Sequence, residues 1–156
     1  MKKTVKQKIN FFDTSALLGG YALDKDELNY ISNIVFQELE HIKISYEKDE
    51  KIKYKARSLV RYLMSNRDLW RTEDTNWRRV EKLLAKTPTL EDRHDSRLIC
   101  EARMLSGRYD VQFVTADASQ YLLANGFKEL NALYYNETRH KERLWKGFKH
   151  IDLTDE

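Results

Sequence analysis

Two short apolar runs, each followed by an aspartate, constrain the fold of this chain more than any other feature. Residues 9–12 run into Asp13, and residues 111–115 are followed one position later by Asp117. Apolar runs of this length are typical of buried strands. Helical periodicity lies between them, so the sequence predicts an α/β domain with a mainly parallel central sheet covered by helices. In such sheets functional groups gather beyond the carboxyl ends of the strands, where we expect both aspartates.

The other segments divide into helices and one further strand. We expect helices over residues 14–18, from Ser32-Asn33 through 42, and over 51–64, 92–105 and 117–124, and a last strand over 130–135. Residues 67–88 are ambiguous, because their apolar spacing suggests a helix that Thr87-Pro88 would end. The expected order is strand, helices, strand, helix, strand.

Length and composition favour one soluble domain over residues 1–156, with a core at about 9–135 and a C-terminal tail at 136–156. The chain is 41% hydrophobic and 34% charged, and no apolar run approaches the roughly 18 residues of a membrane span. No signal peptide is visible, and the single cysteine, Cys100, cannot form an internal disulfide. A cytoplasmic location without membrane contact is therefore expected, with Cys100 in the core.

Basic stretches that carry tryptophans suggest a nucleic-acid partner. The net charge of +3 is weak evidence, but residues 48–55, 67–82 and 139–150 are locally basic, and the last two include Trp70, Trp77 and Trp145. Basic groups bind phosphates, and aromatic faces stack on unpaired bases. For any single stretch we prefer the alternative, a solvated helix face with its tryptophans packed inward. The candidate nucleic-acid contacts are Arg78, Arg79 and Arg97.

Four acids are the candidates for chemistry: Asp13, Glu38, Asp95 and Asp117. Glu38 has apolar neighbours along its helix, and Asp95 lies at a helix start. Taken singly, the aspartates could be helix caps or charges favoured at a helix N-terminus. Together they would repel one another unless Mg²⁺ or Mn²⁺ were held between them, and two ions about 4 Å apart could activate water against a phosphodiester. Glu40, Glu91, Asp92 and Glu101 are expected to be solvated, and the chain has neither a Cys/His zinc cluster nor a phosphate-binding loop.

Four segments resemble the motifs of the PIN-domain nuclease family in order and spacing. They are FFDTSALL at 11–18, VFQELE at 35–40, HDSRLI at 94–99 and FVTAD at 113–117. His94 stands where the family often has Asn, and Ala116 replaces a common Asn or Arg. We expect His94 to be a polar neighbour of the site rather than a ligand. The likeness is nearest to the PIN module that precedes an ATPase in PhoH-like proteins, whose strand-like exit resembles residues 146–153.

This resemblance implies a three-layer PIN-like fold and a Mg²⁺- or Mn²⁺-dependent endoribonuclease acting on single-stranded RNA. It makes Asp13, Glu38, Asp95 and Asp117 the catalytic metal ligands, with Thr14, Ser15, Thr115 and Ser119 as supporting residues. The alternatives are a nucleic-acid-binding module with a dormant site, the toxin of a toxin-antitoxin pair, and a structure-specific 5′ DNA nuclease. Homodimerisation, an ATPase and an antitoxin are the protein partners that the resemblance suggests.

Overall fold

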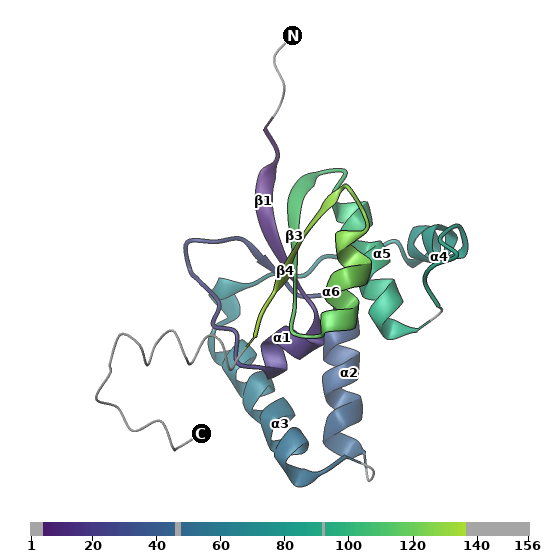
Figure 1. Cartoon of the computed structure of the whole chain (residues 1–156). Helices are drawn as coiled ribbons and strands as arrows, with labels where there is room; N and C mark the ends of the chain where they lie inside the picture. Colours follow the sequence, from purple (N-terminus) through teal and green to yellow (C-terminus); the bar gives the residue numbers. More distant parts are fainter. Residues whose placement is uncertain (1–4, 46–47, 92, 137–156) are drawn as a thin grey trace, which may run out of the picture.

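The computed structural model describes residues 5–45, 48–91 and 93–136, and its centre is a parallel sheet. The four strands lie in the order β2-β1-β3-β4 and all neighbours are parallel. Their bounds are β1 Gln7–Phe12, β2 Asn29–Tyr30, β3 Tyr109–Thr115 and β4 Leu130–Tyr134. Helices flank this sheet (Figure 1), which confirms the expected α/β class.

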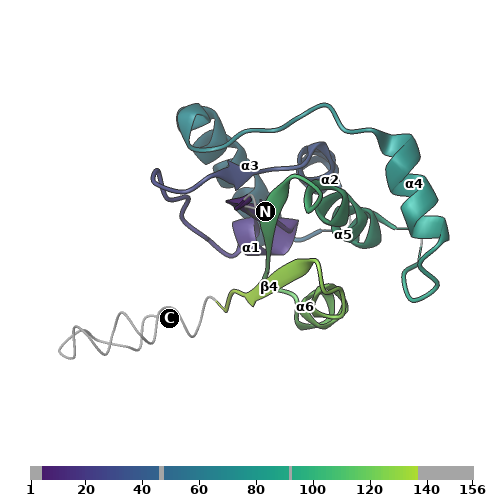
Figure 2. The same cartoon turned by 90° about the horizontal axis from the view of Figure 1, so that it is seen from above.

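The helices follow the predicted order closely. They are α1 Thr14–Leu18, α2 Asn33–Ile44, α3 Glu50–Ser65, α4 Trp77–Ala85, α5 His94–Leu105 and α6 Ala118–Asn125. The ambiguous segment at 67–88 resolves into a short 3₁₀ helix, η1 (Arg67–Leu69), an extended stretch and α4. Helix α4 lies outside α5 in both views (Figures 1 and 2). The expected strand-like exit at 146–153 and Trp145 fall outside the described residues.

Strand β1 is the centre of the core, and its pairing with β3 positions the functional edge. Phe11 is fully buried and stacks between Tyr30 and Phe113, with ring centroids 5.5 and 5.7 Å away. The register pairs Phe12 with Val114. The next residue, Asp13, donates its backbone N–H to the Val114 carbonyl over 2.8 Å. The end of β1 therefore lies beside the end of β3.

The edge strand β2 was not expected, because it has only two residues and one of them is a buried asparagine. Asn29 is 1% exposed. Its side-chain amide donates to the carbonyls of Asp24 and Leu69 over 3.0 and 2.9 Å, and its Oδ1 accepts from Asn10 on β1. Amide contacts with three separate segments hold this edge in place. They leave no hydrophobic pattern in the sequence.

Glu101 on α5 is buried, contrary to the expectation that it is solvated. It is 1% exposed. Its carboxylate accepts hydrogen bonds from Ser32 (2.5 Å), Thr75 (2.7 Å) and Tyr30 (3.0 Å). Burial raises the pKa of this carboxyl above its usual value. We call Glu101 with these three hydroxyls the Glu101 cluster; it joins β2, the start of α2 and the stretch before α4 to α5.

Two smaller expectations can be compared with the structure. Cys100 is fully buried in the core, as expected. Within residues 5–45, 48–91 and 93–136, none of the helices has both the length and the apolar character needed to traverse a lipid bilayer.

Truncating Glu101 is expected to destabilise the fold. Glu101→Ala would leave a cavity and three hydroxyls, two of them on buried residues, without this acceptor, which should lower the free energy of unfolding by about 2–4 kcal/mol. The matched control is Glu40→Ala, whose side chain is 62% exposed and forms an ion pair with Lys43; it should change stability by less than about 0.5 kcal/mol. Urea denaturation of both variants measures the difference. Equal effects would show that the Glu101 cluster contributes nothing to stability.

Candidate functional site

Asp13 is a buried carboxylate at the end of β1. It is 4% exposed and has extended backbone at the N-terminal boundary of α1, but its side chain does not cap that helix. Instead, Oδ2 accepts hydrogen bonds from Thr115 Oγ1 (2.7 Å) and Ser15 Oγ (2.9 Å). Within the described residues, Oδ1 accepts no hydrogen bond and the carboxylate forms no ion pair. One oxygen of this buried acid is therefore left without a partner.

Glu38 and Asp95 are close enough to Asp13 to act on its charge. Burial raises the pKa of Asp13 to about 6, against the opposing hydrogen bonds from Thr115 and Ser15, and the negative charges of Asp95 and Glu38 raise it further. Burial also raises the pKa of Glu38, to which the charge of Asp95 adds. The structure thus brings three of the four predicted acids into one electrostatic neighbourhood, from β1, α2 and α5.

Asp117 is placed differently from the other three acids. It is exposed and caps α6, where its Oδ1 accepts from the backbone N–H groups of Ser119 (2.9 Å) and Gln120 (3.3 Å). It is connected to Asp13 through Thr115, whose Oγ1 accepts from the Asp117 backbone N–H over 3.0 Å. Oδ1 of Asp117 therefore acts as the helix cap, as one of the two interpretations of the sequence predicted. Its Oδ2 has no hydrogen-bond partner among the described residues.

Three of the four predicted supporting residues take part in the hydrogen bonds around the acids. Thr14 donates to Glu38 over 2.7 Å. Ser15 and Thr115 donate to Asp13, and the Ser15 hydroxyl also accepts the Ala116 backbone N–H over 2.9 Å. Ser119 is exposed, and its hydroxyl forms no hydrogen bond with the described part of the chain. Hydroxyls on α1 and β3 thus fix the orientation of two of the acids.

Gln120 is a site residue that sequence reasoning missed. It is 2% exposed on α6, and its side-chain amide donates to the Asp95 backbone carbonyl over 2.6 Å. This bond ties the first turn of α5 to α6 and so helps to hold Asp95 at the site. Its spacing of four from the buried Ala124 places both on the inner side of α6, a signal that a helical projection could have found.

The acids offer the oxygen donors that Mg²⁺ and Mn²⁺ prefer, but their side chains are not gathered into a formed metal site. Among residues 5–45, 48–91 and 93–136, no three His, Cys, Asp or Glu side chains lie close enough together to hold an ion. The donor chemistry fits a hard divalent cation, because a buried carboxylate with an open oxygen lies near two further acids. The geometry of coordination is not formed by the protein alone.

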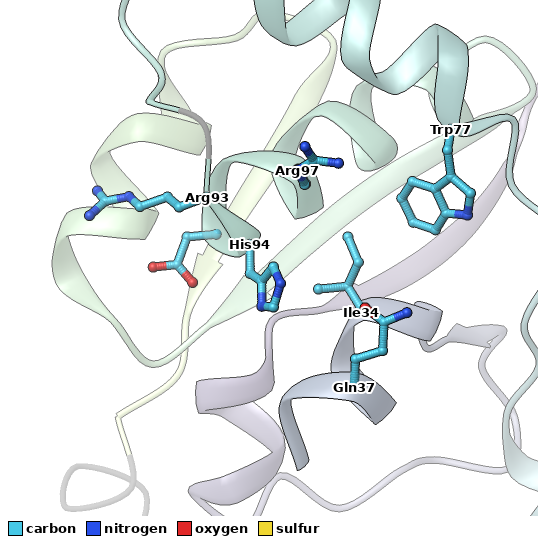
Figure 3. Close-up of a pocket in the computed structure, with 7 residues that line it drawn as sticks. Ile34, Gln37, Trp77, Arg93, His94 and Arg97 are labelled. Atoms are coloured by element: carbon cyan, nitrogen blue, oxygen red, sulfur yellow. The ribbon is translucent and has the colours of Figure 1, made fainter. Parts of the chain in front are cut away.

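A pocket of about 780 Å³ adjoins this acidic edge (Figure 3). Asp95 lines it together with Arg93, His94 and Arg97 from the start of α5, Ile34 and Gln37 from α2, and Trp77 from α4. Burial has the largest effect on the pKa of Glu38 and raises it. The charge of His94 has a smaller effect in the opposite direction. Of the three predicted nucleic-acid contacts, Arg97 lines this pocket. Arg79 lines a smaller one beside Glu101, and Arg78 is exposed on α4 without lining either.

Comparison with known proteins finds similarity of fold. No family model and no curated protein sequence matches the chain. A domain of a functionally unknown protein from Methanocaldococcus jannaschii DSM 2661 matches with a TM-score of 0.52 and 20% identity, covering 83% of this chain and 91% of that one. VapBC-5 from Mycobacterium tuberculosis, a member of the VapBC family of toxin-antitoxin systems, matches with a TM-score of 0.54 and 15% identity over 81% and 98%. The likeness supports a PIN-like fold.

Asp13→Asn is expected to stabilise the protein at neutral pH. Because the pKa of Asp13 rises from 3.8 in the unfolded chain to about 6 in the fold, the native state binds more protons than the unfolded state between these values. The free energy of unfolding of the wild type therefore falls as pH rises through this window. The Asn variant does not show this fall, because its amide does not ionise. By pH 7 its relative gain should be on the order of 1–3 kcal/mol, and near pH 4 it should be small.

Denaturant unfolding at both pH values, in the presence of a chelator, measures this gain. The control is Asp26→Asn, at an exposed position, which should show the same difference from wild type at both pH values. A stability difference for Asp13→Asn that does not grow with pH would contradict the burial of an ionisable Asp13.

Proposed function

We propose that this protein is a metal-dependent ribonuclease that hydrolyses phosphodiester bonds of single-stranded RNA, with divalent cations held by Asp13, Glu38, Asp95 and Asp117. The observation that carries the proposal is the environment of Asp13. This carboxylate is buried beside two other acids, has no cationic partner among the described residues, and keeps one oxygen open. A carboxylate so placed costs stability unless a cation compensates it.

Divalent cations supply the chemistry in such a site by activating a water and stabilising the leaving oxygen of the phosphodiester. The residues of the chain itself would position the ligands. Ser15 and Thr115 hold Oδ2 of Asp13 and leave Oδ1 for a cation, and Thr14 holds Oε1 of Glu38. These hydroxyl contacts reduce the rotational freedom of both acids before any ion binds.

Asp95 and Asp117 would complete the ligand set from the two flanking helices. Gln120 fixes the backbone at Asp95, and the capping bonds of Asp117 occupy its Oδ1 and leave its Oδ2. The four acids would then hold Mg²⁺ or Mn²⁺, both of which accept oxygen ligands and retain waters. The four PIN-like motifs support the same assignment, and we propose a cytoplasmic setting for it.

A second candidate function, the toxin of a toxin-antitoxin pair, is favoured by one observation. The similar structure of VapBC-5 belongs to a toxin-antitoxin system and is matched over 98% of its length. The same ribonuclease chemistry would then be controlled by an antitoxin. Induced expression in a bacterial host tests this: wild type should arrest growth, and Asp13→Asn should not. Unimpaired growth of cells that contain active wild-type enzyme would contradict the toxin role. It would favour the alternative in which the domain works with an ATPase, as in PhoH-like proteins.

Cleavage is expected to require both the cation and Asp13. Purified protein should degrade single-stranded RNA with Mg²⁺ or Mn²⁺ and stop in excess EDTA. Asp13→Asn should reduce the rate at least about a hundredfold, because the amide cannot supply the charge that binds the cation. A gel assay on wild type and variant, with added Mn²⁺, measures this effect. Activity that persists in chelator would contradict the proposal.

Asp117→Asn separates capping from ligation. Asn caps helices as well as Asp does, so the thermal melt of this variant should match wild type without metal. Its cleavage should fall and its stabilisation by Mn²⁺ should shrink if Asp117 is a ligand. Full cleavage would assign Asp117 to capping alone, and RNA binding without cleavage by wild type would favour the dormant binding module.

A further inference from the structure

The pocket beside Asp95 is built from two kinds of surface. One side comes from the start of α5, with the cations of Arg93 and Arg97, and the other from α2 and α4, with Ile34 and the Trp77 indole. In Figure 3, Ile34 lies between His94 and Trp77, and the Arg93 side chain extends from the start of α5 in the direction away from Trp77. The pocket therefore has a flat apolar wall and a separate charged side.

Trp77 is half-buried in a way that keeps it available to a ligand. It packs against the core while contributing to the pocket wall, at the first residue of α4. Among the described aromatic contacts it forms no ring pair, whereas Trp70 makes a tilted ring contact with Phe36 and lies under Arg67. An indole without an aromatic partner in a pocket wall is suited to stack on a planar ring.

Arg93 supplies a cation that the fold does not use. It is exposed, and its guanidinium forms neither a hydrogen bond nor an ion pair with residues 5–45, 48–91 or 93–136. Arg97, by contrast, pairs with Glu81 over 3.2 Å. Asp95 between these arginines belongs to the acidic edge, so a phosphate on Arg93 would lie at the entrance to the candidate catalytic site.

We propose that this pocket is the seat of an unpaired nucleotide of the RNA strand, with its base stacked on Trp77, and that Arg93 holds a backbone phosphate farther along the same strand. The volume of about 780 Å³ lies within the roughly 300–1,000 Å³ of small-ligand sites. Gln37 offers an amide that can donate to and accept from a base edge. This inference rests on the proposed nuclease function, and it adds the place on the protein where the RNA strand is bound.

Such a seat selects single strands for a physical reason. In a duplex each base is stacked and paired, so it reaches a protein pocket only after an unfavourable unstacking. An unpaired base enters without that cost and gains the stacking on the indole. The nucleotide in the pocket would place the adjoining phosphodiester beside Asp95.

Binding to short single-stranded RNA and to an abasic strand of equal length tests the proposal without relying on cleavage. Fluorescence anisotropy in EDTA gives the affinities. Trp77→Ala should weaken RNA binding about tenfold or more and leave the abasic strand unaffected, while Trp77→Phe should retain most of the affinity. Arg93→Ala should weaken the binding of both the RNA and the abasic strand, and it should reduce the salt dependence of that binding. Trp70→Phe is the matched control, since Trp70 lies outside this pocket, and should change neither affinity.

A second readout keeps Trp77 intact and so does not depend on the folding of the alanine variant. The chain has three tryptophans, and Trp70→Phe with Trp145→Phe leaves Trp77 as the sole tryptophan, which can be excited selectively over the tyrosines. RNA should quench its emission and the abasic strand should not. Absence of quenching on RNA binding, or equal losses for RNA and abasic strands in Trp77→Ala, would overturn the nucleotide seat. Cleavage by wild type with Mn²⁺, measured separately, shows whether the nuclease proposal fails independently.

Discussion

The burial of the Asp13 carboxylate is the constraint on which the functional edge depends. The parallel pairing of β1 with β3 continues to Phe12 and Val114, and the next residue of β1 is the acid. Its carboxylate is thereby held beside Thr115 at the end of β3. Two hydroxyl donors cannot replace the solvation that a charged carboxylate loses on burial, so the pKa of Asp13 rises to about 6. A cation would remove this cost, which links the core of the fold to the proposed metal binding.

A comparison with Glu101 shows what a structural buried acid looks like in the same protein. Three hydroxyls donate to the Glu101 carboxylate, and both of its oxygens are used. Asp13 has two donors on a single oxygen. The first arrangement ties four segments together, whereas the second leaves one carboxylate oxygen without a hydrogen-bond donor among the described residues. The difference in hydrogen bonding separates a structural acid from a candidate ligand better than burial does.

Helix α5 connects these features. Its first turn carries Asp95 and lines the pocket, and its middle holds the Glu101 cluster. Through Thr75 that cluster fixes the chain two residues before Trp77. The position of the proposed nucleotide seat therefore depends on a buried carboxylate on the same helix as Asp95. A hydrogen bond from Gln120 on α6 to the backbone carbonyl of Asp95 holds the first turn of the same helix.

The sequence by itself determined the α/β class, the strands that end near Asp13 and Asp117, and most helices, because hydrophobic period and capping residues are local signals. It also indicated Thr14, Ser15 and Thr115 as neighbours of the acids. Only the tertiary structure decided that β2 is an edge strand held by Asn29, that Glu101 is buried, and that Trp77 and Arg93 share a pocket with Asp95. These depend on hydrogen bonds and packing between residues distant in the chain, which leave no periodic trace in the sequence.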